Sequence, residues 1–144
     1  MLPTPTEGQE IVADYGSLGL SLRRHPLALL RSGLRRHGLL PAGDVLQRPH
    51  GQRVRTGGLV ITRQRPASAN DVTFVTLEDE TGHINLVVWK RLAERQRAIL
   101  LGARLLGVLG EVQREGAVVH VVARRLYDHS ALLGDLDARS RDFR

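Results

Sequence analysis

The hydrophobic spacing of the chain changes near residue 51. Before that point leucines recur at spacings of roughly three to five with arginines between them, at Leu20, Leu22, Leu27, Leu30 and Leu34. This spacing is typical of an amphipathic helix. Pro26 suits the first turn of a helix and Gly38 its end, so we predict a helix between them. A second short helix is predicted to open at Pro41 with Asp44 as its cap.

From Arg53 onward apolar and polar residues alternate with a period of two, which is the pattern of β-strands. Two hairpin turns are predicted, at residues 80–82 and 115–116. The Gly57-Gly58 pair permits a bulge or sharp coiling in the first strand. The predicted strands span residues 53–63, 73–79, 83–89, 104–114 and 117–127, with a helix over 90–101.

Five strands with one helix between the third and the fourth is the element order of an OB-fold barrel. Closing such a sheet also removes its free edges. We therefore expect a mainly β protein: a five-stranded OB-fold barrel with an N-terminal helical extension and a short C-terminal tail. The expected divisions are 1–50 for the helical connector, 51–128 for the barrel and 129–144 for the tail. Three leucines of the tail indicate a short docked helix: Leu132, Leu133 and Leu136.

Charge points to a class of partner. The 144 residues include 21 Lys plus Arg against 15 Asp plus Glu, a net charge of +6, and residues 23–65 carry ten of the arginines. Lys90 is the only lysine, a bias that a GC-rich genome produces as readily as a phosphate-binding surface does. The positive charge itself favours a polyanionic partner, because like charges on a small domain repel one another.

Several kinds of chemistry are disfavoured. The chain has no cysteine, its six histidines lack ligand spacing, and we expect neither a metal nor another cofactor. The glycine pair lacks the rest of a phosphate-binding loop, and the serines lack a nucleophile elbow. The acidic run Glu78-Asp79-Glu80 could hold a divalent ion, but it is more typical of a hairpin turn. We expect no enzyme activity, and, without a signal peptide or membrane span, a cytoplasmic protein.

Nucleic-acid binding fits the pattern better. OB barrels present strands two and three, with the loops after strand one and between strands four and five, to an unpaired strand. The alternation turns Phe74, Thr76 and Glu78 outward on strand two, and Asn85, Val87 and Trp89 outward on strand three. Phe74 is then placed for stacking and Asn85 for hydrogen bonds to bases, unless the alternation is misread by one residue and Phe74 is core. Trp89 is interpreted as a packing residue, because it ends a strand beside a helix.

Basic side chains adjoin the predicted binding face. Arg63 and Arg65, with Gln64 between them, end strand one, and we expect either phosphate contacts or a merely solvated surface from them. Arg114, near the last turn, is a weaker candidate. The predicted nucleic-acid-binding set comprises Arg63, Gln64, Arg65, Phe74, Thr76, Asn85 and Arg114.

Two runs of sequence carry a family resemblance. Residues 74–82 (FVTLEDETG) followed by 84–89 (INLVVW) resemble the nucleic-acid-binding OB family shared by the anticodon domains of class II aminoacyl-tRNA synthetases and the C-terminal tail of C-family DNA polymerases. In the synthetases, the residue matching Phe74 stacks on an anticodon base. The upstream residues 14–30 (DYGSLGLSLRRHPLALL) resemble the connector of bacterial error-prone C-family polymerases, as do residues 63–66, 113–120 and 140–143.

The resemblance implies a role in damage-tolerant DNA synthesis, together with accessory mutagenesis proteins and the sliding clamp. The PHP, palm and finger domains of that family are absent, so polymerase activity is not expected from this chain. Our first hypothesis is a single-stranded DNA-binding module. The second is a protein-interaction module that holds accessory polymerase proteins through residues 20–34 and the tail, and the third is a tRNA-anticodon domain.

Overall fold

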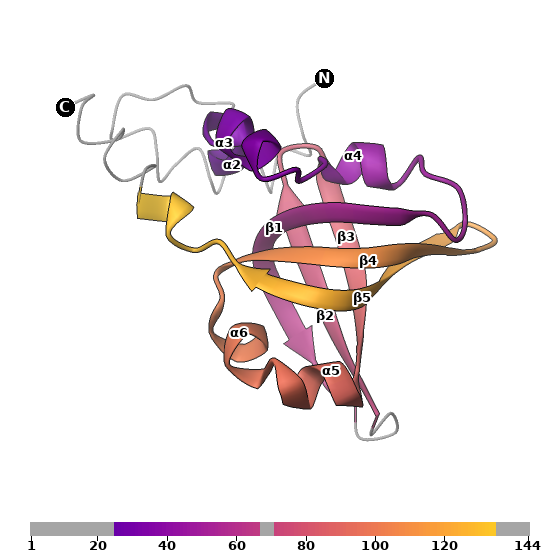
Figure 1. The fold of residues 1–144 in the computed structure, drawn as a ribbon. Coiled ribbons are helices and arrows are strands. Elements are labelled where there is room, and N and C mark those ends of the chain that lie inside the picture. Colours follow the sequence, from indigo (N-terminus) through magenta and orange to yellow (C-terminus); the bar gives the residue numbers. More distant parts are fainter. Residues whose placement is uncertain (1–24, 67–70, 135–144) are drawn as a thin grey trace.

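Five strands form a closed barrel in a computed structural model that describes residues 25–66 and 71–134 (Figure 1). The strands are β1 (Arg53–Gln64), β2 (Val72–Asp79), β3 (Gly82–Trp89), β4 (Leu105–Glu115) and β5 (Val118–Asp128). They join in the order β1-β2-β3-β5-β4, with β3 and β5 parallel and the other pairs antiparallel. This arrangement confirms the predicted five-stranded OB-fold barrel.

The barrel interior is filled by the inward residues of the alternating strands. On β2, Val75 and Leu77 are each 1% exposed, and on β3 the apolar residues Ile84, Leu86 and Val88 are buried as predicted. Aliphatic side chains from β4 and β5 complete the same cluster. The interior contains no aromatic ring among the described residues, and the described rings Phe74, Trp89 and Tyr127 lie outside it.

Two groups of short helices lie at opposite ends of the barrel (Figure 1). The helices at one end are α2 (Pro26–Leu29), α3 (Arg31–Arg36) and α4 (Ala42–Val45), and those at the other are α5 (Lys90–Arg95) and α6 (Arg97–Gly102). Leucines of the first group form a second apolar cluster with Leu105 and Leu133. The helical period predicted before residue 38 therefore marks a packed face, although Leu20, Leu22 and Leu136 lie outside the described residues.

The helices are more broken than the sequence predicts. Leu30 separates α2 from α3, and Gln96 separates α5 from α6. The Gln96 side chain exchanges two hydrogen bonds with the backbone of Leu126 on β5, at 2.8 and 2.9 Å, and so fastens the break to the barrel. The predicted cap at Asp44 is wrong, because that residue lies inside α4. Asp79 accepts the hydrogen bond from the Ala42 N–H at the start of α4 instead.

Strand β1 carries an irregularity that the sequence did not locate. Its register against β2 shifts between Val60 and Thr62, which leaves Ile61 as the extra residue. The glycine pair lies earlier in the strand, where Gly58 packs on the backbone of Glu78: an added Cβ would lie 2.8 Å from the Glu78 carbonyl oxygen. Of the helices in the described ranges, none has the length and apolar character needed to cross a membrane.

Candidate nucleic-acid interface

The outer surface of β2 and β3 carries two rows of side chains. Directly opposed residues on neighbouring strands point to the same face, so the strand register defines each row. One row is polar, and the other has three apolar residues at its centre with polar or charged residues at its ends. The polar row is Thr62, Thr76, Asn85, His120 and Gln113, and the other is Gln64, Phe74, Val87, Val122, Glu111 and Arg53.

The side chains of the polar row are accessible. Thr62 and Asn85 are exposed, and Thr76 is half-buried beside Asn85, to which its hydroxyl donates a hydrogen bond of 3.2 Å. The orientation of an amide and a hydroxyl adapts to the partner they meet. Three predicted site residues, Gln64, Thr76 and Asn85, thus lie on this surface together with Phe74.

Phe74 is half-buried and lies between its row neighbours Gln64 and Val87. The predicted alternation is therefore correct at this position, and the ring is not part of the barrel interior. A ring held by its neighbours, with part of its surface open, is suited to stacking on a base.

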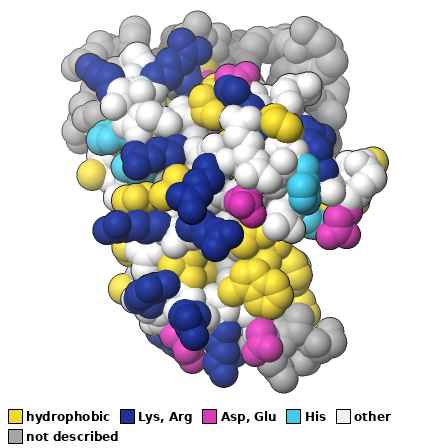
Figure 2. All heavy atoms as spheres, turned by 45° about the vertical axis from the view of Figure 1, so that its right-hand side comes forward, with side chains coloured by type: hydrophobic (Ala, Val, Ile, Leu, Met, Phe, Trp, Pro, Cys, Tyr) yellow, Lys and Arg dark blue, Asp and Glu magenta, His cyan; other side chains and the backbone are white. Residues whose placement is uncertain are grey.

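Trp89 was interpreted as a packing residue, and that interpretation is wrong. The indole is 52% exposed, opposite Val72 and two residues beyond Val87 on the same face of β3. Figure 2 shows hydrophobic side chains gathered on this side of the barrel, with Lys and Arg side chains in a band beside them. Trp89 thus adds an exposed ring to the surface that holds the half-buried ring of Phe74. The period-two pattern of β3 already turned Trp89 outward, and that signal was the better guide.

Arg63 does not lie on the Phe74 surface. It is paired with Val75, an inward residue, and its guanidinium donates hydrogen bonds to the carbonyls of Leu100 at 2.6 Å and Ala103 at 2.5 Å. Arg63 thereby satisfies carbonyl oxygens at the C-terminal end of α6, where a cation is favourable. The expected phosphate contact competes with this structural role.

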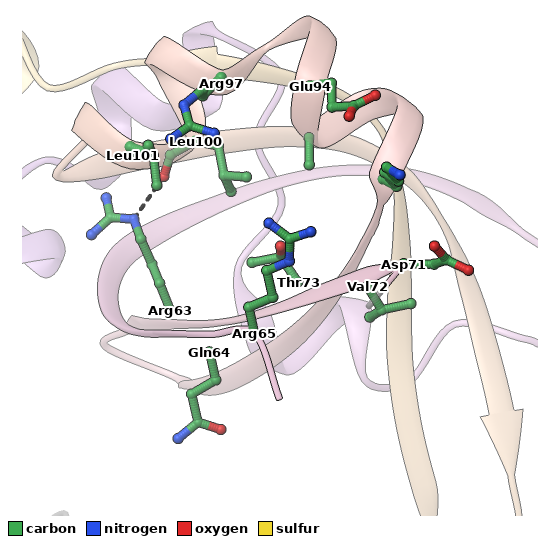
Figure 3. A pocket seen from close by; sticks show the side chains of 12 residues that line it. Arg63, Gln64, Arg65, Asp71, Val72, Thr73, Glu94, Arg97, Leu100 and Leu101 are labelled. Atoms are coloured by element: carbon green, nitrogen blue, oxygen red, sulfur yellow. Dashed lines mark hydrogen bonds between the residues drawn. The ribbon is translucent and has the colours of Figure 1, made fainter. Parts of the chain in front are cut away.

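Arg65 lies two residues further, over the same end of the barrel. Figure 3 shows its side chain rising into a cavity of about 260 Å³ between the end of β1 and helices α5 and α6, whereas Gln64 points away from that cavity. The predicted trio therefore divides: Gln64 joins the outer face, and the two arginines face the helices.

Arg114 is held by the connector. Its guanidinium donates hydrogen bonds to the carbonyls of Arg48, at 2.8 Å, and Leu46, while its backbone N–H donates to Nδ1 of His50. These bonds fix the segment between α4 and β1 against β4. Arg114 is a structural residue here, and it is the weakest member of the predicted set.

The acidic run on the β2–β3 turn fastens the connector helices. Arg31 of α3 donates to Glu80 through Nε at 2.7 Å and Nη2 at 2.6 Å, and to Asp79 at 3.2 Å. Glu78 was expected to point outward to solvent, but it is 7% exposed and pairs with His25 and His83 at 3.0 Å each. The connector covers this end of β2, which local alternation does not reveal.

The contacts between Arg31 and the acidic run, which together form a clamp between the connector and the β2–β3 turn, also keep Glu80 ionised over a wider pH range. Burial alone would raise the pKa of Glu80, but the hydrogen bonds and positive charge of Arg31 outweigh it and hold that pKa below its ordinary value. Within the described residues, no group of three or more His, Cys, Asp or Glu side chains has the geometry to hold a metal ion. Asp79 accepts hydrogen bonds from Thr81 and Gly82 within the turn, which is the predicted hairpin chemistry. The contacts of the acidic run to the connector were not predicted.

Comparison with known proteins places this surface in context. Residues 54–128, just over half of the chain, match the family described as "OB-fold nucleic acid binding domain". The error-prone DNA polymerase of Alkalilimnicola ehrlichii is 64% identical over 142 residues, and that of Azoarcus sp. is 57% identical. Each alignment covers 99% of this chain but only 14% and 13% of the respective polymerase, so the chain spans about a seventh of its relatives. The predicted resemblance to error-prone polymerases is confirmed.

Solved structures agree on the fold. Asparaginyl-tRNA synthetase from Pyrococcus horikoshii matches 63% of this chain and 22% of its own, with a TM-score of 0.52 and 23% identity. An OBody bound to hen egg-white lysozyme matches 62% of this chain and 87% of its own, with a TM-score of 0.51 and 13% identity. Both likenesses are those of a shared barrel.

Proposed function

Because the chain belongs to the family of OB-fold nucleic acid binding domains, we propose that its outer β2–β3 face binds single-stranded DNA. One observation carries the proposal: Phe74 is partly exposed on that face, and the adjacent outward pair on the same two strands is Thr76 and Asn85, whose side chains are hydrogen-bonded to each other. A ring that stacks on any base, beside groups that bond to base edges, is the usual arrangement of an OB-fold surface for unpaired strands.

The charge of the chain supports the same partner. Arg53 and Arg55 on β1 and Arg124 and Arg125 on β5 are exposed on the outside of the barrel. Arg124 forms an ion pair with Glu111 at 3.6 Å, but an ion pair this exposed to solvent is weak and leaves the arginine available to a phosphate. A DNA backbone that follows the barrel finds cations beside the aromatic surface.

The proposed biological setting follows the relatives. In an error-prone DNA polymerase, this module binds an unpaired template strand during damage-tolerant synthesis and performs no chemistry itself. Binding that depends on a ring and on backbone charge tolerates any sequence, which suits a template of arbitrary and damaged bases.

Titration of a fluorescently labelled oligothymidylate tests the proposal. Stacking on one ring is worth about 1–3 kcal/mol, so Phe74→Ala is expected to weaken binding by roughly 5-fold to 150-fold. Ile61→Ala is the matched control, because Ile61 is an exposed apolar side chain, 47% accessible, at the extra residue of β1. Absence of binding at low salt, or equal effects of the two substitutions, would refute the proposal. Tighter binding of the matching RNA would favour the tRNA-anticodon alternative.

A second function, docking of an accessory polymerase protein or the sliding clamp, is favoured by one surface feature. Ile61 and Leu101, 47% and 54% exposed, line a hollow of about 520 Å³ between β1 and α6. Large exposed apolar side chains that line one hollow are typical of protein contacts. Purified accessory protein is expected to bind the wild-type chain and not Leu101→Asp. Equal binding of the accessory protein to the wild-type chain and to Leu101→Asp would count against a protein contact in this hollow.

A further inference from the structure

We infer that bound DNA continues from Phe74 onto Trp89 and from there into the basic cavity between the end of β1 and helices α5 and α6, where its phosphates are held. This inference rests on the proposed function and extends it to a second contact zone. The zone consists of Trp89 and three cations of the cavity, Arg65, Lys90 and Arg97.

The cavity is cationic and has unneutralised charge. Arg63, Arg65, Lys90 and Arg97 line it against two carboxylates, Asp71 and Glu94. Arg63 is occupied by the carbonyls of α6, but Lys90 and Arg97 have no ion-pair partner in the described part of the chain. In Figure 3 the side chains of Arg65 and Arg97 point toward the same space. Like charges gathered around one hollow repel one another, and an anion in the hollow relieves that repulsion.

Trp89 joins this cavity to the Phe74 surface. Lys90, the next residue, lines the cavity, and so does Val72, the cross-strand partner of Trp89. The hydrogen bond from the Lys90 N–H to the Asp71 carbonyl, 2.7 Å, holds the two strand ends together at this rim. On the other side, Val87 separates Trp89 from Phe74 by one step of the same outer face. An indole 52% exposed at the junction provides a stacking position between the two zones.

Nucleic acid fits this combination better than an acidic peptide does. An acidic peptide pairs with the cations but does not need the exposed ring of Trp89 and the partly exposed ring of Phe74 beside them. A single strand needs both, because bases and phosphates alternate along it at regular intervals. Arginine and lysine side chains around a cavity also suit the phosphate group, with which arginine forms paired hydrogen bonds.

The inference predicts a dependence on strand length. A short oligothymidylate of about 4 nucleotides covers the Phe74 surface alone, and one of about 16 nucleotides reaches the cavity, these being the limits of OB-fold site sizes. Trp89 is the only tryptophan of the chain, so its fluorescence reports directly on stacking. We expect the longer strand to quench it and the shorter strand to leave it largely unchanged.

Charge substitution tests the cavity itself. Lys90→Gln with Arg97→Gln removes two phosphate contacts, which lowers the slope of log affinity against log salt by about 1.4. The loss of affinity for the longer strand between about 50 and 200 mM salt then becomes about sevenfold smaller than in the wild type. The matched control is Arg35→Gln with Arg36→Gln, which removes two exposed charges from α3 at the opposite end of the barrel. Trp89→Ala is expected to weaken binding of the longer strand, and Trp89→Phe to restore it.

The outcomes separate the two proposals. If Phe74→Ala weakens binding while the cavity variant matches its control, the second zone is wrong and the proposed function stands. Failure of the wild type to bind any strand defeats both. If the cavity variant leaves DNA affinity intact but abolishes binding of an acidic peptide, the occupant of the cavity is a protein and the inference is overturned.

Discussion

Replacing Asp79 by asparagine is expected to destabilise the barrel strongly, although the two side chains have nearly the same shape. The carboxylate is completely buried and receives hydrogen bonds from five donors. Oδ2 accepts from the Ala42 N–H at 2.7 Å and from Arg31 at 3.2 Å. Oδ1 accepts from the N–H and hydroxyl of Thr81, each at 2.7 Å, and from the Gly82 N–H at 3.2 Å.

An asparagine cannot accept this set of bonds. Whichever way its amide is turned, the NH₂ group faces at least two donors and leaves them unsatisfied in a buried place. The substitution also removes one of the two carboxylates that pair with the partly buried Arg31. Breaking a buried charged contact costs about 3–5 kcal/mol. Because a small domain has a total unfolding free energy of about 5–15 kcal/mol, the variant should lose a large fraction of it.

Urea denaturation measures this loss. With a slope of about 1.5 kcal/mol per molar urea, the midpoint should fall by roughly 2 M or more. Asp44→Asn is the control: Asp44 is exposed on α4, and its substitution should change the unfolding free energy by less than about 0.5 kcal/mol. An Asp79→Asn protein within about 1 kcal/mol of the wild type would show that the clamp between the connector and the β2–β3 turn contributes little.

Two further predictions concern packing and pH. Gly58→Ala places a Cβ 2.8 Å from the Glu78 carbonyl oxygen and should lower the unfolding free energy by about 1–3 kcal/mol in the same urea assay, whereas Gly102→Ala, which meets nothing within 4 Å, should have little effect. The pKa of His129 is lowered by burial and by the charge of His37, against an opposing effect of Asp128. Protonation of this histidine therefore favours the unfolded state. Its contribution to the free energy of unfolding should be complete above the ordinary pKa of 6.5 and should decline as the pH falls from 6.5 through the lowered pKa. His129→Gln should flatten that decline in pH-dependent melts, and an unchanged slope in the variant would contradict the assignment.

Local alternation predicted the barrel because the interior is built from it. The inward positions at the centres of β2 and β3 are apolar, so the period-two pattern alone identified both strands and their faces. The same pattern could not predict what covers the outside. Glu78 follows the outward alternation, yet His25, 53 residues earlier, packs against it and buries it. Contacts of that sequence separation come from tertiary packing and leave no local signal.

Trp89 shows the opposite error. Alternation predicts its outward position correctly, whereas the tendency of aromatic residues beside helices to pack does not hold for it. The chain enters α5 at Lys90, directly after the strand, and Leu92 is the buried residue of that helix. The indole is therefore left uncovered. In a chain with 3% aromatic residues, and with an interior that the aliphatic side chains already fill, an outward ring has no packing role to perform.

The directions in which Arg63 and Arg65 point, at the end of β1, depend on a register shift of one residue. With uninterrupted alternation from the inward Val54, Thr62 would face the interior, while Arg63 and Arg65 would face outward beside Phe74. The extra residue between Val60 and Thr62 reverses that order, so Thr62 and Gln64 join the outer rows and the arginines turn toward α6. A bulge at Ile61 therefore determines which side chains of β1 lie on the outer β2–β3 face and which line the cavity. The glycine pair does not mark the bulge, because a bulge of this kind requires one additional residue and no glycine.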